Sequence, residues 1–107
     1  MNVAEEIFTE LGGPRFLIDI RCTDPCAIDN GLRLRLRINR SHANYLEITK
    51  GEDDLYTMKF LDIHKPKWDR KNKTMIKHKV KTLREIAQIE GSNLRKVFSL
   101  ITGFELT

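Results

Sequence analysis

Two cysteines and three histidines are the residues of this sequence that could ligate a transition metal. Cys22 and Cys26 are separated by three residues, and the histidines are isolated from one another at His42, His64 and His78. A structural zinc site takes four ligands, usually as two closely spaced pairs. Because the sequence supplies one cysteine pair and no second pair, we expect no metal and no other cofactor. We interpret the cysteines as reduced thiols in a loop.

Carboxylates form the other group of side chains that could do chemistry. The acids at residues 52–54 follow Gly51, and such polar clusters are common at the tip of a turn. Asp19 and Glu47 are expected on one face of a sheet, but an acid–base site would require a histidine to converge with them in a cleft. The sequence contains no nucleophile elbow, phosphate-binding loop or dinucleotide fingerprint. We therefore expect no catalytic residues and a protein that is not an enzyme.

Length and composition indicate one folded domain over residues 1–107. A chain of 107 residues, 40% of them hydrophobic, suffices for one core and not for two. Its apolar runs are too short to span a bilayer, and its first residues lack the basic and apolar regions of a secretory signal. We therefore expect no membrane partner and a cytoplasmic location.

The charged residues are unevenly distributed along the chain. Residues 1–31 carry two basic and six acidic side chains, residues 32–82 carry fourteen and six, and residues 83–107 carry three of each. The net charge of +4 therefore arises from a central excess of +8. Such a dipole can steer an anionic partner toward the central segment.

The hydrophobic pattern predicts a helix near each end of the chain. Apolar residues recur at helical spacing over residues 3–11, where a Gly-Gly-Pro sequence ends the helix. A second apolar stripe covers residues 94–101, with Ser92 or Asn93 as its N-cap and Gly103 as its C-cap.

Between the helices, apolar and polar residues alternate, which predicts strands. The five predicted strands cover residues 15–21, 32–38, 45–50, 55–63 and 74–81. An Asp-Asn-Gly turn precedes the second strand, and residues 64–73 form a basic excursion around Trp68. Residues 82–90 fit either a helix or a continued strand. Because the connections are short, we predict an α+β fold, an antiparallel meander with both helices on one face.

The opposite face of this sheet would be open, and the alternation places nine cations on it beside only Asp19 and Glu47. Neighbouring cations repel one another, so we predict that this face binds an anionic partner, DNA or RNA first. The alternative is a solvated face that maintains solubility. The predicted nucleic-acid-binding residues are Arg15, Arg21, Arg33, Arg35, Arg37, Lys59, Lys77, Lys79 and Lys81.

A second interpretation assigns the protein to another class. It would be an interaction module that engages a host protein, either by adding a strand at a sheet edge or through Trp68 and its loop. A salt titration separates the two classes, because affinity for nucleic acid falls steeply with ionic strength.

Several segments, in order, resemble a group of small proteins. The segments are Leu-Gly-Gly-Pro-Arg-Phe at 11–16, Asn-Arg-Ser-His-Ala-Asn-Tyr-Leu-Glu-Ile-Thr at 39–49, Asp-Leu-Tyr-Thr-Met-Lys-Phe at 54–60, and Leu94 with Val-Phe-Ser-Leu-Ile-Thr-Gly at 97–103. They resemble small uncharacterised proteins encoded by bacteriophages, prophages and related bacterial mobile elements, with a Leu-Gly-Gly-x-Lys-Phe start, a Tyr-Thr-Met-x-Phe strand and a Thr-Gly end. The chain departs from that pattern at Pro14, where Asn is usual, and in residues 22–29. The resemblance implies an accessory protein in the cytoplasm of a bacterial host, and it implies no activity.

Overall fold

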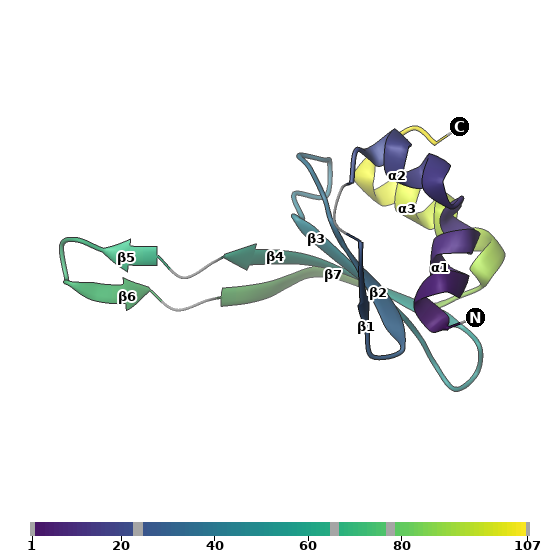
Figure 1. The fold of residues 1–107 in the computed structure, drawn as a ribbon, viewed down its shortest axis with the longest axis horizontal. Helices are drawn as coiled ribbons and strands as arrows, with labels where there is room; N and C mark the ends of the chain where they lie inside the picture. Colours follow the sequence, from purple (N-terminus) through teal and green to yellow (C-terminus); the bar gives the residue numbers. More distant parts are fainter. Residues whose placement is uncertain (1, 23–24, 65–66, 77–78, 107) are drawn as a thin grey trace.

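The computed structural model describes residues 2–22, 25–64, 67–76 and 79–106. These residues form an α+β fold in which the helices lie on one side of an antiparallel sheet and a narrow arm projects from one end of it (Figure 1). The helical elements are α1 (Val3–Leu11), α2 (Pro14–Ile20), the 3-10 helix η1 (Gly91–Asn93) and α3 (Leu94–Thr102). The strands are β1 (Cys26–Ile28), β2 (Gly31–Arg35), β3 (Tyr45–Lys50), β4 (Tyr56–His64), β5 (Lys67–Asp69), β6 (Thr74–Ile76) and β7 (Lys79–Ile89).

The main sheet has the predicted meander topology. Within the described residues, five strands pair in the order β1-β2-β3-β4-β7, each antiparallel to its neighbour. Leu34, Leu46 and Phe60 are register partners on three adjacent strands, and all three are fully buried. The row therefore forms the centre of the sheet's core face.

The two predicted helices are confirmed, and both pack against this sheet (Figure 1). Helix α1 begins at Asn2, whose side chain accepts a hydrogen bond from the Glu5 N–H at 2.8 Å, and it contacts β2, β3 and α3. Helix α3 buries Leu94 and Phe98 and ends at Gly103, which has a left-handed φ of 78°. The two helices thus cover the same apolar face.

Residues 15–21, predicted as a strand, form helix α2 instead. Gly13 has φ 66°, and Pro14 occupies the first turn of the helix, where its missing N–H costs nothing. Phe16 and Ile20 are buried four residues apart, whereas Ile18, which the strand pattern grouped with them, is 70% exposed. Positions four apart share a face in a strand and in a helix. In a segment of only seven residues, the apolar pattern therefore did not distinguish a strand from a helix.

Strand β1 takes the place in the sheet that was predicted for residues 15–21. It lies between the first and second predicted strands, and Asn30, with φ 54°, forms the predicted turn into β2. The following strand, β2, ends at Arg35, earlier than predicted. Consequently Ile38, which the alternation directed inward, is fully exposed.

Residues 82–89, ambiguous in sequence, belong to the long strand β7. Its register with β4 shifts twice, and Gln88 has φ 58° at one of these bulges. Ile86 and Ile89 pair with Met58 and Tyr56, so three steps along β7 match two steps along β4. The bulge therefore produces the spacing of three that resembled a helix.

The arm consists of the ends of β4 and β7 followed by the β5–β6 hairpin (Figure 1). Because β3 pairs with β4 only as far as Leu61, the pairing from Asp62 to His64 involves β7 alone. The molecule measures 49 × 30 × 22 Å and has a radius of gyration of 15.1 Å, above the roughly 13 Å of a compact chain of this length. The protruding arm accounts for this elongation.

The sequence did not predict this arm. Residues 64–73, predicted as an excursion, contain β5, and the predicted strand at 74–81 is divided between β6 and β7. Val80, predicted to face the core, is 55% exposed, and His78, predicted beside it, lies outside the described residues. Over the described ranges, no helix combines the length and apolar character needed to cross a membrane.

Candidate functional site

The open face of the sheet carries a row of alternating charges rather than a field of cations. Arg33, Glu47, Lys59 and Glu85 are successive register partners across β2, β3, β4 and β7. Arg33 donates from Nε to Glu47 Oε2 at 2.8 Å and bonds the same oxygen through Nη2. Lys59 Nζ lies 4.0 Å from Glu85 Oε1. The predicted cationic character of this face is therefore wrong along its central row, because Glu85 lies in the segment whose structure was ambiguous in sequence.

Two further predicted cations lie on helix α2 and not on the sheet. Arg15 Nε lies 3.6 Å from Asp19 Oδ1 within that helix. Arg21 caps the C-terminus of α2 with a left-handed φ of 54°. The assignment of both arginines to the open sheet face is therefore corrected, and Asp19 leaves that face with them.

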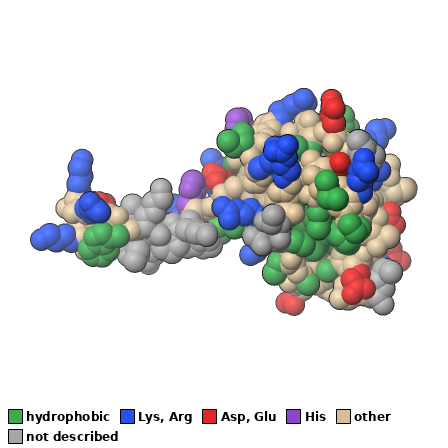
Figure 2. All heavy atoms as spheres, turned by 45° about the horizontal axis from the view of Figure 1, so that its top comes forward, with side chains coloured by type: hydrophobic (Ala, Val, Ile, Leu, Met, Phe, Trp, Pro, Cys, Tyr) green, Lys and Arg blue, Asp and Glu red, His purple; other side chains and the backbone are tan. Residues whose placement is uncertain are grey.

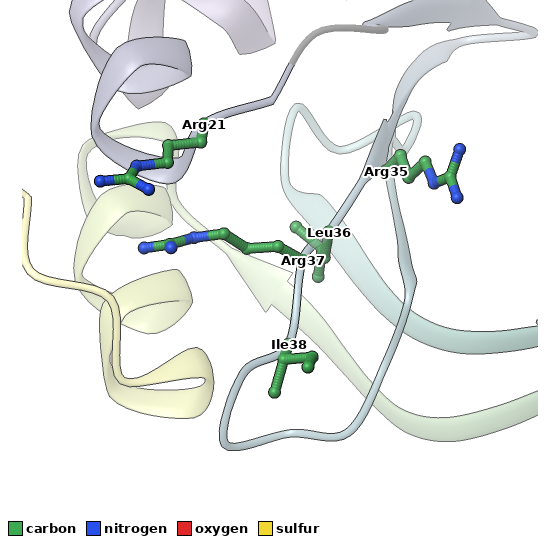
Figure 3. Close-up of a pocket in the computed structure, with 5 residues that line it drawn as sticks. All are labelled: Arg21, Arg35, Leu36, Arg37 and Ile38. Carbon is green, nitrogen blue, oxygen red and sulfur yellow. The ribbon is translucent and has the colours of Figure 1, made fainter.

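A shallow hollow brings three of the predicted arginines together. Arg21, Arg35 and Arg37, with Leu36 and Ile38, line a space of about 430 Å³ (Figure 3). The side chains of Arg21 and Arg37 extend in the same direction, whereas Arg35 extends the opposite way (Figure 3). The hollow therefore presents two guanidinium groups to the same region of solvent.

The arm contains the densest positive charge in the molecule. Residues 64–81 hold eight of the 19 Lys and Arg residues but one of the 15 Asp and Glu residues, so their net charge is +7 while the rest of the chain sums to −3. In Figure 2, Lys and Arg side chains gather at the tip of the arm, whereas basic and acidic side chains are mixed over the body. The cations of the arm whose side chains the structure describes are Arg70, Lys71, Lys73, Lys79 and Lys81, all of them exposed.

Asp69 and, just before residues 64–81, Asp62 are both engaged in other contacts. Asp69 accepts hydrogen bonds from the backbone N–H groups of Lys71 at 3.0 Å and Asn72 at 3.4 Å, and so holds the hairpin turn. Asp62 Oδ2 lies 3.0 Å from His64 Nε2. Among the described residues, the arm's five exposed cations take part in no ion pair. Trp68, on β5 between these charges, is 58% exposed.

Only part of this arm belongs to the predicted set. Lys79 and Lys81 lie on β7 at the root of the arm, beyond the face shared with β3, and Lys77 lies outside the described residues. Arg70, Lys71 and Lys73 were not predicted as site residues, although the basic excursion containing them was noted. The run of like charges was the signal that identifies them.

The residues considered for metal or acid–base chemistry do not converge in the described part of the chain. There, no three His, Cys, Asp or Glu side chains gather as a metal site would require. Cys22 is buried and Cys26 is exposed. Asp19 on α2 pairs with Arg15, and Glu47 on β3 pairs with Arg33. The two acids therefore lie on separate elements.

Two side chains at the end of the sheet beside the β3–β4 turn have raised pKa values. Lys50 Nζ donates a hydrogen bond to Glu6 Oε2 at 2.9 Å, and this contact raises the pKa of Lys50. Burial raises the pKa of the neighbouring Tyr56 phenol. Lys50 ties α1 to β3 and Tyr56 belongs to the hydrophobic core, so we interpret both groups as structural.

Comparison of the chain with protein-family models, with curated proteins and with solved structures gives no match.

Proposed function

We propose that this protein is a non-enzymatic accessory protein of a bacterial mobile element that binds nucleic acid through its basic arm, duplex DNA first. The observation that carries the proposal is the net charge of +7 over residues 64–81, whose described strands β5 and β6 form a protruding hairpin. The segment's exposed cations form no ion pair among the described residues. Phosphate groups would supply the missing counter-charges and release condensed counterions on binding.

The shape of the arm favours a grooved duplex. The major groove of B-DNA, about 12 Å wide, admits a two-stranded β-ribbon, whereas the major groove of A-form RNA is too narrow for side-chain readout. The arm ends in the β5–β6 hairpin, whose turn is held by hydrogen bonds to Asp69. An exposed Trp68 beside the cations adds a flat surface for contact with sugars or bases.

The arm replaces the open sheet face as the expected contact. Along the sheet, each cation of the central row faces a carboxylate, so a phosphate would compete with Glu47 and Glu85. On the arm, Asp62 is the register partner of Lys81, but the exposed cations whose side chains the structure describes take part in no ion pair there. The electrostatic attraction therefore concentrates at residues 64–81 and falls off toward the body within a Debye length of about 10 Å.

Fluorescence anisotropy with a labelled duplex of about 30 base pairs, titrated between about 50 and 200 mM salt, tests the proposal. The arm variant carries Lys71→Ser, Lys73→Ser and Lys79→Ser. A control with the same charge change on the body carries Lys59→Ser, Arg84→Ser and Lys96→Ser. We expect the arm variant to lower the slope of log affinity against log salt by about 2.7 and the body variant to change it by less than about 1.

Three results would contradict the proposal. They are no binding by the parent at low salt, equal losses in the arm and body variants, and an affinity that does not vary with salt. Parallel titrations with duplex RNA and with a single DNA strand identify the preferred nucleic acid. Tighter binding to either of these would reject the duplex-DNA preference.

A second candidate function is that of a module that binds a host protein. The observation that favours it is strand β7, an edge of the main sheet whose outer side is open to strand addition, with Val80 55% exposed along it. The two bulges in β7 interrupt this edge and oppose such pairing. Capture of the same host protein before and after nuclease treatment would favour this candidate over the first.

A further inference from the structure

The arginine hollow lies at the same end of the sheet as the arm. Arg35 pairs with Tyr45, which pairs with Leu61, and the arm begins at the next residue of β4. The hollow is formed where the chain leaves β2 and enters the loop of residues 36–44. The loop and the root of the arm therefore lie at the same end of the sheet.

The loop is firmly attached to the root of the arm. Asn44 donates from Nδ2 to the Ile63 carbonyl oxygen at 2.8 Å and accepts the Ile63 N–H on Oδ1 at 2.8 Å. Within the loop, Asn39 Nδ2 donates to the carbonyl oxygens of Arg37 and Ala43, both at 2.8 Å. The backbone that carries Arg37 is therefore held at a defined position relative to the arm.

The guanidinium group of Arg37 is positioned by an aromatic ring. It lies 5.1 Å from the centre of the Phe104 ring, a geometry typical of a cation–π contact. Phe104 is itself held on both sides, since its N–H bonds Thr102 Oγ1 at 3.3 Å and its carbonyl accepts from Ser99 Oγ at 2.6 Å. Stacking on a ring leaves the N–H groups in the guanidinium plane available to an anion.

Arg21 reaches the hollow from a different element. It caps α2, where its backbone N–H bonds the Ile18 carbonyl at 3.2 Å. Among the described residues, neither Arg21 nor Arg37 forms an ion pair. Both guanidinium groups extend in the same direction from the lining of the hollow, so both charges attract an anion that enters it (Figure 3).

We infer that the hollow between Arg21 and Arg37 binds a backbone phosphate of the same nucleic acid that the arm engages. This inference rests on the proposed function and adds a second, separate contact on the body. Arg37 forms the preorganised, bidentate contact, because its planar group matches the geometry of a phosphate. Arg21 supplies the second charge, and Arg35, which extends the opposite way, does not contact this phosphate (Figure 3).

Anisotropy titrations with the same labelled DNA duplex test the inference. The hollow variant carries Arg21→Ser and Arg37→Ser, and Arg35→Ser with Arg84→Ser serves as the control with an equal charge change. We expect the hollow variant to lose affinity roughly tenfold or more and to lower the salt slope by about 1.8, the value for two lost phosphate contacts. The control should lower affinity by less than about threefold.

A conservative change separates positioning from charge. Arg37→Lys keeps the charge but lacks the planar fork, and Phe104→Leu keeps apolar packing but removes the ring. Both variants should lose affinity for the duplex roughly threefold or more while they retain the parent's thermal melting curve within a few degrees. Wild-type affinity in Arg37→Lys would overturn the bidentate contact.

The inference and the proposed function fail in different ways. If the parent binds DNA, the arm variant does not, and the hollow variant binds as the parent does with the same salt slope, then the hollow is not a phosphate site and the proposed function stands. If the parent does not bind nucleic acid, both are overturned.

Discussion

The side chain of Asn44 pairs with the backbone of Ile63 as a strand residue would. Both the Nδ2–O and the Oδ1–N distance are 2.8 Å, and the Asn44 N–H also bonds the Leu61 carbonyl at 3.0 Å. These bonds extend the β3–β4 ladder by one step at the point where the arm leaves the sheet. Asn44 therefore supplements the β4–β7 pairing at the junction between body and arm.

Replacing Asn44 with Ala is expected to loosen the root of the arm. The change removes two side-chain hydrogen bonds to the Ile63 backbone in a half-buried position, which should cost about 1 to 3 kcal/mol of unfolding free energy. Urea denaturation measures this loss, and hydrogen exchange at the Ile63 amide should accelerate. Asn72→Ala, at the exposed tip of the arm, is the control. Unchanged exchange at Ile63 would contradict the assigned role.

Truncating Phe98 is expected to destabilise the core severely. Phe98 is fully buried, 5.0 Å from Phe16 and 5.9 Å from Phe104 between ring centres. Phe98→Ala should cost roughly 3 to 5 kcal/mol, because it leaves a cavity where three elements meet. Leu100→Ala, on the same helix but 66% exposed, should cost less than about 0.5 kcal/mol. Equal melting temperatures for the two variants would contradict the packing of α3 on the sheet.

The fold could be predicted where one pattern of apolar residues, alternating or helical, continues through a whole element. The alternation in β3 and β4 and the helical stripe of α3 are long enough to specify both the element and its buried face. The short segment α2 was misread because Phe16 and Ile20 share a face in either structure. β1 is three residues long, and it forms because β2 offers an edge, a tertiary cause that local pattern does not contain.

The site was predicted less well, because charge can be read from sequence but pairing cannot. Arg33 and Lys59 were expected to attract anions, yet their register partners Glu47 and Glu85 oppose them. That arrangement depends on the register of β7, which two bulges determine. Arg21 and Arg37 were both predicted as site residues, but their shared hollow depends on the turn of α2 and on the position of Phe104.

Stability is expected to fall as the pH rises through about 10. The pKa of Lys50 is raised above its ordinary value of 10.5 by the hydrogen bond to Glu6, so this contact stabilises the fold below that pH and is lost as Lys50 deprotonates. The pKa of Tyr56 is raised above 10.0 by burial, so above pH 10 the unfolded chain ionises more readily than the folded one. In both cases the folded state binds more protons, and the free energy of unfolding therefore declines with pH.

Urea midpoints measured across this alkaline range check the expectation. A Tyr56→Phe and Lys50→Gln double variant removes both groups, so its stability should vary less with pH than that of the parent. Tyr45→Phe, which removes a phenol on the opposite face of β3, is the control. A parent whose midpoint rises above pH 10, or a double variant that follows the parent's pH curve, would contradict the assignment.

Gly31 is expected to be required for the pairing of β2 with β3. A Cβ atom at this position would lie 2.2 Å from the Ile48 carbonyl oxygen and 3.0 Å from Thr49 Cγ2. The Ile48 carbonyl oxygen belongs to the backbone of β3 and cannot rotate away as a side chain can. Gly31→Ala must therefore shift β2 relative to β3, at a cost of about 1 to 3 kcal/mol of unfolding free energy. Urea denaturation of Gly31→Ala, of Thr49→Ser and of the double variant separates the two obstacles. If the carbonyl is responsible, Thr49→Ser does not restore the stability of Gly31→Ala, whereas full restoration in the double variant would show that the threonine methyl group is the obstacle.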